Sequence, residues 1–520
     1  MQSSIRERGS PGLTKLLKNR PIIIASNRGP VEFRQDNSGD IEMKRGGGGL
    51  VTAMTAVSEA AHAVWISAAM NDVERSIAQD NSLIGFPEDS PQYRVKLVNI
   101  PKDVYNSYYN TISNPLLWFI HHYIWNLTET PSFTAETHQA WKNGYVVANK
   151  LFAEAVAKES LKHDSPIIML QDYHLFIAAK YIREITDEPF LFHFTHIPWP
   201  EPDYMSILPF DIRQQLLKGM LANDMVGFQS RHYAGNFLLC CESLLGAQVN
   251  WRKRTVVWQG REVYVRTYPI SIDHANLHKM SESSKVLKLE QKLLEENEGM
   301  NLIVRTDRSD PSKNIVRGFM AYDVLLTKHP ELKEKVKFLA LLYPTRENIR
   351  EYKRYRSEIE ATVEAINKRH KTKKWTPIYL RLKDNYPESI AALKCYDVLL
   401  VNPIFDGMNL VAKEGPAINT RNGVLVLSQN AGASSELGSS SIIVNPFDIE
   451  ETANAMYQAL TMSDSEKQIR AKSLKEVVEQ NNSIKWLHYQ LKDIVSLEKK
   501  RVSVRVSGDV PEKLNNYITT

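Results

Sequence analysis

The chain has 520 residues and a formal net charge of +5 at pH 7. This length corresponds to about three to four domains of ordinary size, or to two large ones, and it excludes a single small binding module. With 43% hydrophobic and 24% charged residues, the composition is that of a folded chain. So small an excess of positive charge excludes the broad basic field of a nucleic-acid or membrane-surface protein. Any bound phosphate must therefore be held by a few local basic residues.

The cysteine content indicates a reducing compartment. Cys240, Cys241 and Cys395 are too few for a disulfide framework, and two of them are sequence neighbours. No stretch approaches the ~18–20 uninterrupted apolar residues of a membrane span, and residues 1–9 are polar. We therefore expect a cytoplasmic protein with no nucleic-acid or membrane partner.

Short apolar runs rich in β-branched residues recur along the chain, each followed by a polar or Gly-rich turn and a helical stretch. This alternation is typical of βαβ units in a parallel sheet. The clearest runs are residues 21–26, 166–170, 190–194, 301–305, 336–342, 398–401 and 423–427. Because they occur in both halves, we predict two doubly wound α/β domains.

The domain boundary is expected near residues 274–300, a charged helical stretch that precedes the first strand of the second half. The predicted domains are residues 1–280 and 281–490, and the last helix can pack back on the first domain. Residues 498–520 are charged and then polar, which predicts a frayed tail. Ligands bind beyond the carboxyl ends of parallel strands, so two facing sheets would place a cleft between the domains.

Two features near the N-terminus suit a phosphate group. Arg28 follows the first predicted strand, and four glycines at residues 46–49 precede a predicted helix at residues 51–63. Exposed N–H groups at a helix start can cradle a phosphate, and Arg28 and Arg45 can add charge-assisted contacts. A flexible surface loop is the alternative. The run matches neither the GxGxxG pattern nor the GxxxxGK(S/T) pattern.

A carboxylate and an imidazole follow the next two predicted strands. Asp172 comes two residues after the run at residues 166–170, and His196 comes two residues after the run at residues 190–194. Together they could bind sugar hydroxyls. The alternatives are a helix cap for Asp172 and a structural role for His196.

Basic residues follow two strands of the second half. Arg308 and Lys313 are five residues apart across a turn that contains Pro311, a spacing that suits a diphosphate leaving group. Arg346 follows the next predicted strand and could anchor another phosphate. A solvated charged turn is the alternative. Further on, residues 406–414 connect a strand to a helix whose first N–H groups could face a phosphate while Glu414 reaches a ribose hydroxyl.

Taken together, these segments resemble the trehalose-6-phosphate synthase family of retaining glycosyltransferases over residues 22–491. The matching motifs are Ser26-Asn27-Arg28, the glycine run, Tyr108-Tyr109-Asn110, Leu117-Trp118, Asp172-Tyr173-His174, His196-Ile197-Pro198, Gly227-Phe228-Gln229, Tyr268-Pro269-Ile270, residues 406–414 and Val444-Asn445-Pro446-Phe447. The resemblance implies the GT-B fold of two facing Rossmann-like domains. It also implies transfer of glucose from a nucleotide-diphosphate glucose to glucose 6-phosphate, forming α,α-trehalose 6-phosphate with no metal or cofactor.

The resemblance also implies which residues form the site. The first domain would bind the acceptor and the second the nucleotide sugar. The acceptor residues would be Arg28, Tyr109, Trp118, Asp172 and Arg346. The donor residues would be Gly48, Gly49, Arg308, Lys313, Asp406, Gly407, Met408, Asn409, Leu410, Val411 and Glu414. The catalytic group would be Asp172, His196, Arg308, Lys313 and Asp406, with Arg308 and Lys313 stabilising the departing diphosphate. We expect Asp172 and Asp406 to position substrates rather than act as nucleophiles.

Two departures from the family pattern leave other functions open. The family's usual Arg-Leu-Asp-Tyr-Ser-Lys-Gly turn reads Arg-Ser-Asp-Pro-Ser-Lys-Asn at residues 308–314, and Gln171 replaces a histidine. The altered turn is similar to that of validoxylamine-phosphate synthase. A sibling transferase acting on another sugar- or cyclitol-phosphate is therefore an alternative, as is a non-catalytic regulatory subunit. The sequence leaves open whether the donor nucleotide is UDP, GDP or ADP. It is also compatible with a homo-oligomer.

Overall fold

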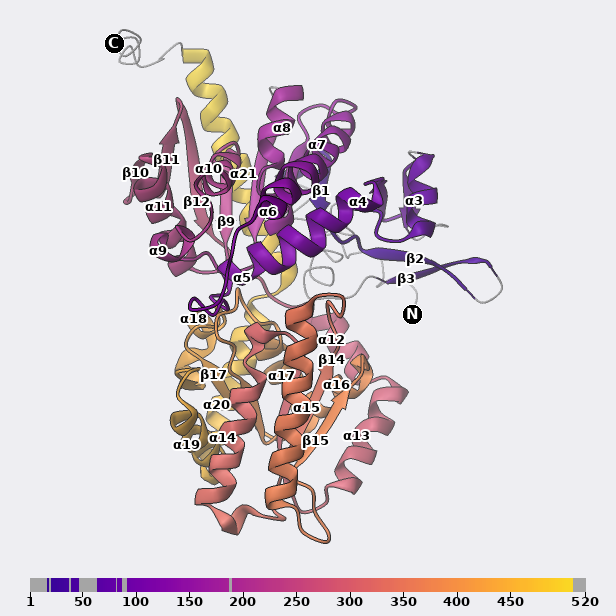
Figure 1. The fold of residues 1–520 in the computed structure, drawn as a ribbon, viewed down its shortest axis with the longest axis vertical. Helices are drawn as coiled ribbons and strands as arrows, with labels where there is room; N and C mark the ends of the chain where they lie inside the picture. The colour runs from indigo at the N-terminus through magenta and orange to yellow at the C-terminus, as the bar shows by residue number, and fades with distance from the viewer. Residues whose placement is uncertain are drawn as a thin grey trace.

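The computed structural model of the protein describes residues 16–17, 20–36, 39–45, 63–80, 82–86, 91–186 and 189–507. It forms two α/β domains, one above the other in Figure 1, each with its own sheet. The predicted helix at residues 51–63 and the glycines at residues 46–49, including the proposed donor residues Gly48 and Gly49, lie outside the described residues.

In the described part of the first domain, the sheet has ten strands. In spatial order they are β10 (Gln248–Asn250), β11 (Thr255–Trp258), β12 (Arg261–Thr267), β9 (Met225–Phe228), β8 (Phe190–Thr195), β7 (Ile167–Gln171), β1 (Ile22–Ser26), β4 (Val64–Ala68), β6 (Tyr93–Val98) and β5 (Ile84–Phe86). The strands from β12 to β6 are parallel, and antiparallel strands complete both edges. A hairpin of β2 (Val31–Gln35) and β3 (Ile41–Arg45) projects from this domain (Figure 1).

The sheet of the second domain is parallel throughout residues 301–444. Its strands lie in the order β15 (Ile378–Leu382), β14 (Val336–Tyr343), β13 (Asn301–Arg308), β16 (Val398–Val401), β17 (Val424–Ser428) and β18 (Ile442–Val444). Numbered along the chain, this is the order 3-2-1-4-5-6 of a doubly wound Rossmann-like domain. The strands predicted in both halves are confirmed as β1, β7, β8, β13, β14, β16 and β17. Their runs of apolar residues are buried on both faces, as parallel strands require.

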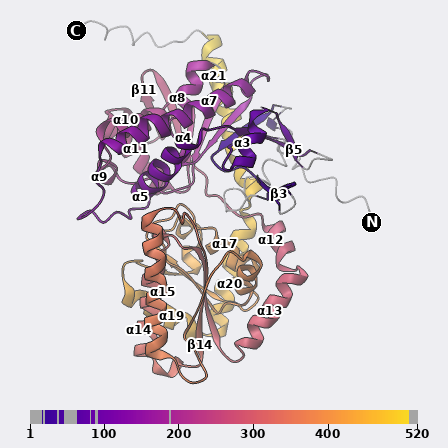
Figure 2. The same cartoon turned by 45° about the vertical axis from the view of Figure 1, so that its right-hand side comes forward.

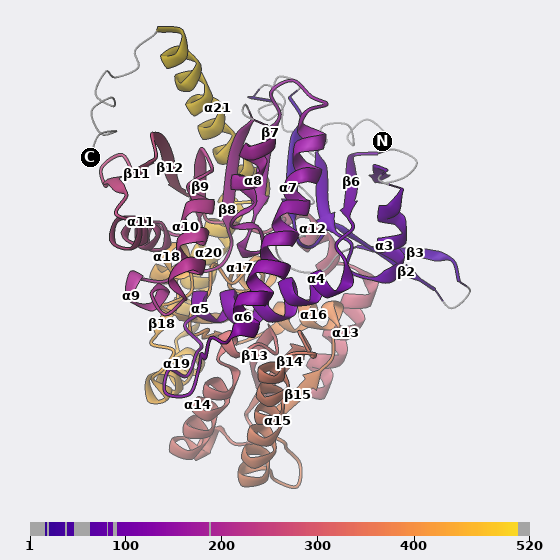
Figure 3. The ribbon, with the colours of Figure 1, turned by 45° about the horizontal axis from the view of Figure 1, so that its top comes forward.

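Helices cover both faces of each sheet. The helices of the first domain are α3 (Asp72–Gln79), α4 (Lys102–Asn106), α5 (Trp118–His121), α6 (Ala135–Ala140), α7 (Val146–Ser160), α8 (Ala178–Ile185), α9 (Pro202–Met205), α10 (Phe210–Met220) and α11 (Arg231–Leu245). A π-helical segment at Ser107–Leu117 joins α4 to α5. Figure 3 shows α7 and α8 in front of the sheet.

The second domain and the C-terminal segment contain α12 (His274–Ser281), α13 (Ser284–Glu296), α14 (Ile315–Lys328), α15 (Arg350–His370), α16 (Tyr386–Cys395), α17 (Val411–Ile418), α18 (Ser434–Leu437), α19 (Ile449–Thr461), α20 (Asp464–Gln480) and α21 (Ser483–Ser507). Helices α14, α15 and α19 pack on one face of the sheet, and α12, α13, α16, α17 and α20 lie on the other (Figure 2). The stretch at residues 274–300 is therefore two helices that pack on the second domain.

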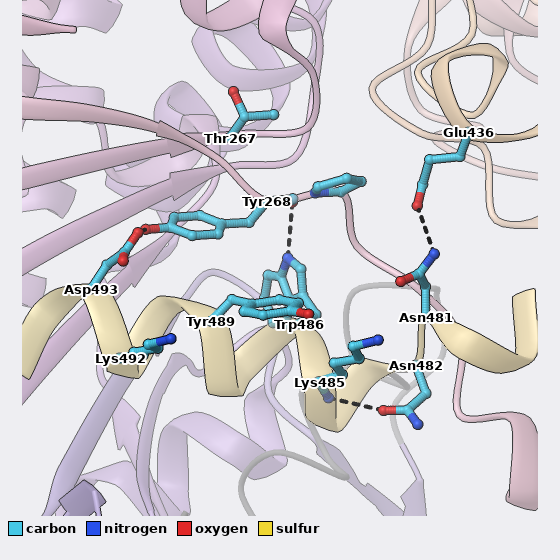
Figure 4. A pocket seen from close by; sticks show the side chains of 11 residues that line it. Thr267, Tyr268, Glu436, Asn481, Asn482, Lys485, Trp486, Tyr489, Lys492 and Asp493 are labelled. Atoms are coloured by element: carbon cyan, nitrogen blue, oxygen red, sulfur yellow. Dashed lines mark hydrogen bonds between the residues drawn. The ribbon is translucent and has the colours of Figure 1, made fainter. Parts of the chain in front are cut away.

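The chain crosses between the domains twice, and the two crossings lie side by side. The first crossing follows β12 and the second precedes α21, which runs along the first domain's sheet (Figure 1). Trp486 Nε1 donates to the backbone oxygen of Tyr268 at 3.0 Å, and the Tyr268 hydroxyl donates to Asp493 at 2.6 Å. Figure 4 shows these contacts around a pocket of about 410 Å³ that also includes Asn481.

The C-terminal prediction needs a correction. Helix α21 continues through residues 498–507, where we expected a frayed tail. Glu498 accepts hydrogen bonds at 2.6 and 2.7 Å from Arg20, just before β1. This ion pair attaches the helix to the first domain at residue 498, one residue after Leu497, a buried apolar side chain of α21. None of the helices that the structure describes is both long and apolar enough to cross a membrane. The three cysteines are free and buried.

Candidate active site

Loops that follow the strands of the two sheets meet between the domains. The first domain contributes the loops after β1, β7 and β8, and the second those after β13, β14 and β16. The Tyr233 hydroxyl on α11 donates to the backbone oxygen of Asp406 at 2.9 Å, and Trp118 Nε1 donates to Asp310 Oδ1 at 3.3 Å. Apart from Gly48 and Gly49, the predicted site residues follow the carboxyl ends of parallel strands or lie near them, in the region where the domains touch.

Arg28 and Tyr109 lie together on the first domain. Arg28 Nη2 donates to the Tyr109 hydroxyl at 3.5 Å. The Tyr109 ring stacks on Tyr105 and on His174, with ring centres 5.5 and 5.8 Å apart. Burial opposes ionisation of Tyr109, but the charges of Arg28 and Arg346 outweigh it and lower the Tyr109 pKa to about 8. The three predicted acceptor residues thus share one positively charged environment.

Arg346 connects this environment to the second domain. Its Nη2 donates to the hydroxyl of Tyr173 at 3.0 Å across the interface, and its Nη1 donates to Asp310 Oδ2 at 3.3 Å and to the Tyr352 hydroxyl. Arg346 itself has a left-handed backbone with φ of 51°. A guanidinium held at several points presents its remaining N–H groups in a fixed geometry, which suits a phosphate.

Trp118 inserts its ring among the charged groups of the second domain. The guanidinium carbons of Arg346 and Arg308 lie 4.1 and 5.0 Å from the centre of the ring, and His122 stacks on it at 3.9 Å. Cation–π contacts of this kind favour cations over the ring face. Trp118 therefore contacts both Arg346, a predicted acceptor residue, and Arg308, a predicted donor residue.

Asp172 has a strained backbone, with φ of 69° and ψ of 175°. Such a conformation is costly outside glycine and is typical of functional sites. The carboxylate accepts from the backbone N–H of His196 at 3.1 Å, so it points to the neighbouring strand end. Burial raises the Asp172 pKa to about 7, although the His196 N–H and the charge of Arg346 act in the opposite direction.

The ring of His196 is fixed on both sides by glutamines. Gln229 Oε1 accepts from the backbone N–H of Ile270, so its amide nitrogen faces His196 Nδ1 at 3.4 Å. The Nε2 of His196 must then carry the proton, which it donates to Gln171 Oε1 at 2.9 Å. Burial lowers the His196 pKa to about 3, so the ring is neutral. Gln171, one of the two departures from the family pattern, thus orients His196.

Lys313 and Asp406 form a buried ion pair in the second domain. Lys313 Nζ donates to Asp406 Oδ2, and Asn409 Nδ2 donates to the same oxygen at 3.1 Å. Burial opposes ionisation of Asp406, but Lys313 outweighs it and the pKa lies below its usual value. These three predicted donor residues are therefore in direct contact.

The altered turn at residues 308–314 is a capped 3-10 turn that ends in a left-handed residue. Pro311 begins a 3-10 turn, and the Asp310 side chain accepts from the backbone N–H of Ser312. Asn314 has φ of 58° and ψ of 38°, a left-handed conformation that Gly and Asn both tolerate. Asn at the family's Gly position is thus compatible with the turn, and its Nδ2 donates to the backbone oxygens of Asn402 and Pro446.

Residues 407–414 pass tightly against the first domain. A Cβ atom on Gly407 would lie 1.7 Å from the backbone oxygen of His196. Met408 is buried, Leu410 and Val411 are partly buried, and Val411 begins α17. Glu414 lies in the first turn of that helix, and burial raises its pKa to about 7.

Sequence reasoning missed several residues of this site. Asp310, Tyr352 and His122 contact predicted residues directly, but none was proposed. Asp310 lies between Arg308 and Lys313, and that position was the only available signal. Among the described residues, no cluster of three or more His, Cys, Asp or Glu side chains could hold a metal ion.

Two facing Rossmann-like domains that share one cationic site at their strand ends define a glycosyltransferase of the GT-B class. The model of glycosyltransferase family 20 matches residues 20–496, and the chain belongs to that family. The chain is 32% identical over 484 residues to the Aspergillus fumigatus protein named alpha,alpha-trehalose-phosphate synthase (UDP-forming) 1, covering 92% of this chain and 90% of that protein.

Two solved structures have the same fold. One, described as trehalose-6-phosphate from E. coli bound with UDP-2-fluoro glucose, has a TM-score of 0.79 at 29% identity and covers 91% of this chain and 99% of that one. The other, an alpha,alpha-trehalose-phosphate synthase (UDP-forming) from Burkholderia xenovorans in complex with glucose-6-phosphate, has a TM-score of 0.79 at 25% identity with the same coverage. The predicted family and the GT-B fold are confirmed.

Proposed function

We propose that this chain transfers glucose from UDP-glucose to glucose 6-phosphate and forms α,α-trehalose 6-phosphate with retention of configuration. One observation carries the proposal. Arg346 is close to Arg28 and to Arg308, the Trp118 ring contacts both Arg346 and Arg308, and Lys313 lies in the turn that follows Arg308. Four neighbouring cations suit two anionic groups, an acceptor phosphate near Arg28 and Arg346 and a donor diphosphate near Arg308 and Lys313. The relatives named UDP-forming support uracil as the donor base.

The acceptor sugar would lie between its phosphate anchors and Asp172. Arg28, Tyr109 and Arg346 bind the phosphate of glucose 6-phosphate in this proposal. Trp118 packs against the sugar, and the Asp172 carboxylate accepts hydrogen bonds from its hydroxyls. These groups are preorganised by contacts within the protein, so little ordering remains to be done when the acceptor binds.

The donor would lie against the second domain. Arg308 and Lys313 hold the diphosphate, and residues 406–411 contact glucose or phosphate. Glu414 accepts hydrogen bonds from the ribose. The N–H groups at the start of α17 add positive potential near the phosphates. As the bond between the anomeric carbon and the diphosphate oxygen breaks, negative charge grows on the diphosphate, and the fixed cations stabilise it.

Both carboxylates proposed to contact the sugars already accept hydrogen bonds within the protein. Asp406 is bound by Lys313 and Asn409, and Asp172 by the backbone of His196. We infer a reaction on one face of the sugar. The acceptor hydroxyl oxygen bonds to the anomeric carbon as UDP departs, and the hydroxyl proton passes to the departing diphosphate oxygen.

A nucleotide panel tests the proposal. The protein is incubated with UDP-, GDP- and ADP-glucose, each with glucose 6-phosphate, and the released nucleoside diphosphate is measured. Release that requires glucose 6-phosphate is expected with UDP-glucose. Release that requires instead a cyclitol phosphate would favour the sibling transferase, and no release with any pair would favour a regulatory subunit. We also infer a cytoplasmic location, which the three free, buried cysteines support.

Replacing Arg28 by alanine should chiefly weaken acceptor binding. A charge-assisted contact contributes about 1.5–3 kcal/mol, so the KM for glucose 6-phosphate should rise by roughly 10- to 100-fold. The KM for the donor should change little. Steady-state kinetics with each substrate varied in turn measures both. Arg34→Ala, which changes an exposed arginine of the same domain, is the control, and a rise confined to the donor KM would contradict the assignment.

The raised pKa of Asp172 predicts a pH dependence of acceptor use. Because this pKa is about 7, the carboxyl group is protonated at pH 6 and ionised at pH 8, and only the ionised form accepts hydrogen bonds through both oxygens. The kcat/KM for glucose 6-phosphate should therefore rise through about pH 7. Asp172→Asn should lower kcat/KM and flatten this limb. An unchanged limb in the variant would assign the titration to another group.

A further inference from the structure

The carboxylate of Asp310 accepts hydrogen bonds from three separate parts of the site. It is fully buried in the turn after β13. Its Oδ1 accepts from Trp118 Nε1 at 3.3 Å and from the backbone N–H and hydroxyl of Ser312 at 3.0 and 2.8 Å. Its Oδ2 accepts from Arg346 Nη1 at 3.3 Å and from the Tyr352 hydroxyl at 3.2 Å. A carboxylate has about four lone-pair sites, so both oxygens are fully used.

Helix capping explains only part of this arrangement. Asp310 does cap the 3-10 turn Pro311–Lys313 through Ser312. Capping this turn requires only one carboxylate oxygen of Asp310 and only residues of the second domain. It does not require Oδ2 to hold Arg346 and Tyr352, nor Oδ1 to accept from Trp118 in the other domain.

The residues that Asp310 contacts serve the binding of different substrates in the proposed function. Ser312 lies next to Lys313 in the turn proposed to hold the donor diphosphate, whereas Arg346 is a proposed anchor of the acceptor phosphate. Trp118 comes from the first domain and brings its ring over the guanidinium of Arg346. The same carboxylate thus fixes the donor turn, the acceptor anchor and the contact between the domains.

We propose that Asp310 is a positioning residue that couples the donor and acceptor subsites. Because one carboxylate holds both the donor turn and Arg346, a substrate that draws either group toward itself also shifts the other, and the second substrate then meets a site already adjusted to it. The coupling is reciprocal, since each ligand must raise the affinity for the other by the same factor. This inference rests on the proposed function.

The variant Asp310→Asn distinguishes the capping role of Asp310 from its proposed coupling role. Asn is as good a cap as Asp, so its amide oxygen can keep the contact with Ser312. Its amide nitrogen then faces Arg346 and Tyr352, and this NH₂ group cannot accept hydrogen bonds from them. Asp310→Asn therefore keeps the turn and removes the contact with the acceptor anchor.

Calorimetry with UDP and glucose 6-phosphate measures the coupling without turnover. In the wild-type protein, UDP should lower the Kd for glucose 6-phosphate by about five- to 150-fold. In Asp310→Asn this factor should fall toward one, while the Kd for UDP alone changes by less than about threefold. Asp323→Asn, which alters an Asp–Arg pair between α14 and α15, should keep the wild-type factor.

A second variant covers the case in which Asp310→Asn fails to fold. Trp118→Phe removes the Nε1 donor and keeps an aromatic ring, and it should also reduce the factor. In the double variant the factor should stay near one, as in Asp310→Asn, because loss of the Oδ2 contacts alone already removes the coupling. The inference is overturned if wild-type protein binds both ligands without synergy, if either variant keeps the full factor, or if Asp310→Asn loses affinity for UDP alone. Failure to bind either ligand would instead count against the proposed function.

Discussion

Replacing Lys313 by alanine should lower kcat by about 10²- to 10³-fold, the cost of removing one preorganised charge from a developing anion. Lys313 is buried, and its ammonium group pairs with Asp406. Water can replace the lost charge only poorly, because the side chains of Lys313 and Asp406 are 9% and 11% exposed. The variant also leaves the Asp406 carboxylate without its main counter-charge, so the Asp406 pKa should rise.

Steady-state rates at saturating UDP-glucose and glucose 6-phosphate measure this effect. Lys313→Arg should recover part of the rate, since it restores the charge with a different geometry. Lys328→Ala, which removes an exposed lysine paired with Glu450 on the far side of the domain, should act like wild type. A rate within threefold of wild type in Lys313→Ala would remove Lys313 from the diphosphate site.

Adding a single methyl group at Gly407 should be nearly as damaging. The alanine Cβ would lie 1.7 Å from the backbone oxygen of His196 and 2.8 Å from its carbonyl carbon. Backbone atoms cannot rotate away as a flexible side chain can, so the donor loop and the first domain must move apart by more than 1 Å, roughly the displacement that can cost 10²-fold in rate. We expect kcat/KM to fall by about 10²-fold or more.

The matched control for this variant is Gly235→Ala. Gly235 lies within α11, and apart from its chain neighbours and the helix's own nearby backbone no atom comes within 4 Å of an added Cβ. Alanine there should preserve activity and raise Tm slightly, because alanine is the better helix former. Thermal unfolding of both variants shows whether Gly407→Ala remains folded. Full activity in folded Gly407→Ala would mean that the domains do not approach this closely in the reacting complex.

Strands and the residues at their ends could be predicted from the sequence because the signal is local. Apolar β-branched runs bounded by turn residues indicate buried parallel strands, and ligands bind where such strands end. This reasoning located β1, β7 and β13 and drew attention to Asp172 and Arg308. The family resemblance then supplied roles that spacing alone could not.

Contacts between distant segments could not be predicted in the same way. Trp118 and Asp310 are 192 residues apart in sequence, and Asp310 and Tyr352 are 42 apart. No periodicity or motif links such residues, because the first contact depends on how the two domains dock and the second on how α15 packs within the second domain. The two glutamines that orient the His196 ring are another example, since Gln171 looked only like a departure from the family pattern.

The departure at residues 308–314 has a physical explanation. Asn314 adopts the left-handed conformation that the family's glycine would also allow, and Asp310 keeps its contacts with Ser312. Lys313 still reaches Asp406. The turn therefore retains the charges that the ordinary sugar transfer needs, which supports glucose 6-phosphate as the acceptor in our proposal.

Identification of the product tests the central claim most directly. The protein is incubated with UDP-glucose labelled with ¹³C in the glucose and with unlabelled glucose 6-phosphate, and the mixture is followed by NMR. We predict one new disaccharide phosphate in which both anomeric centres have the α configuration and the label occupies only the unphosphorylated ring. A β linkage at the labelled ring, labelled free glucose as the sole product, or no consumption of UDP-glucose would contradict the account.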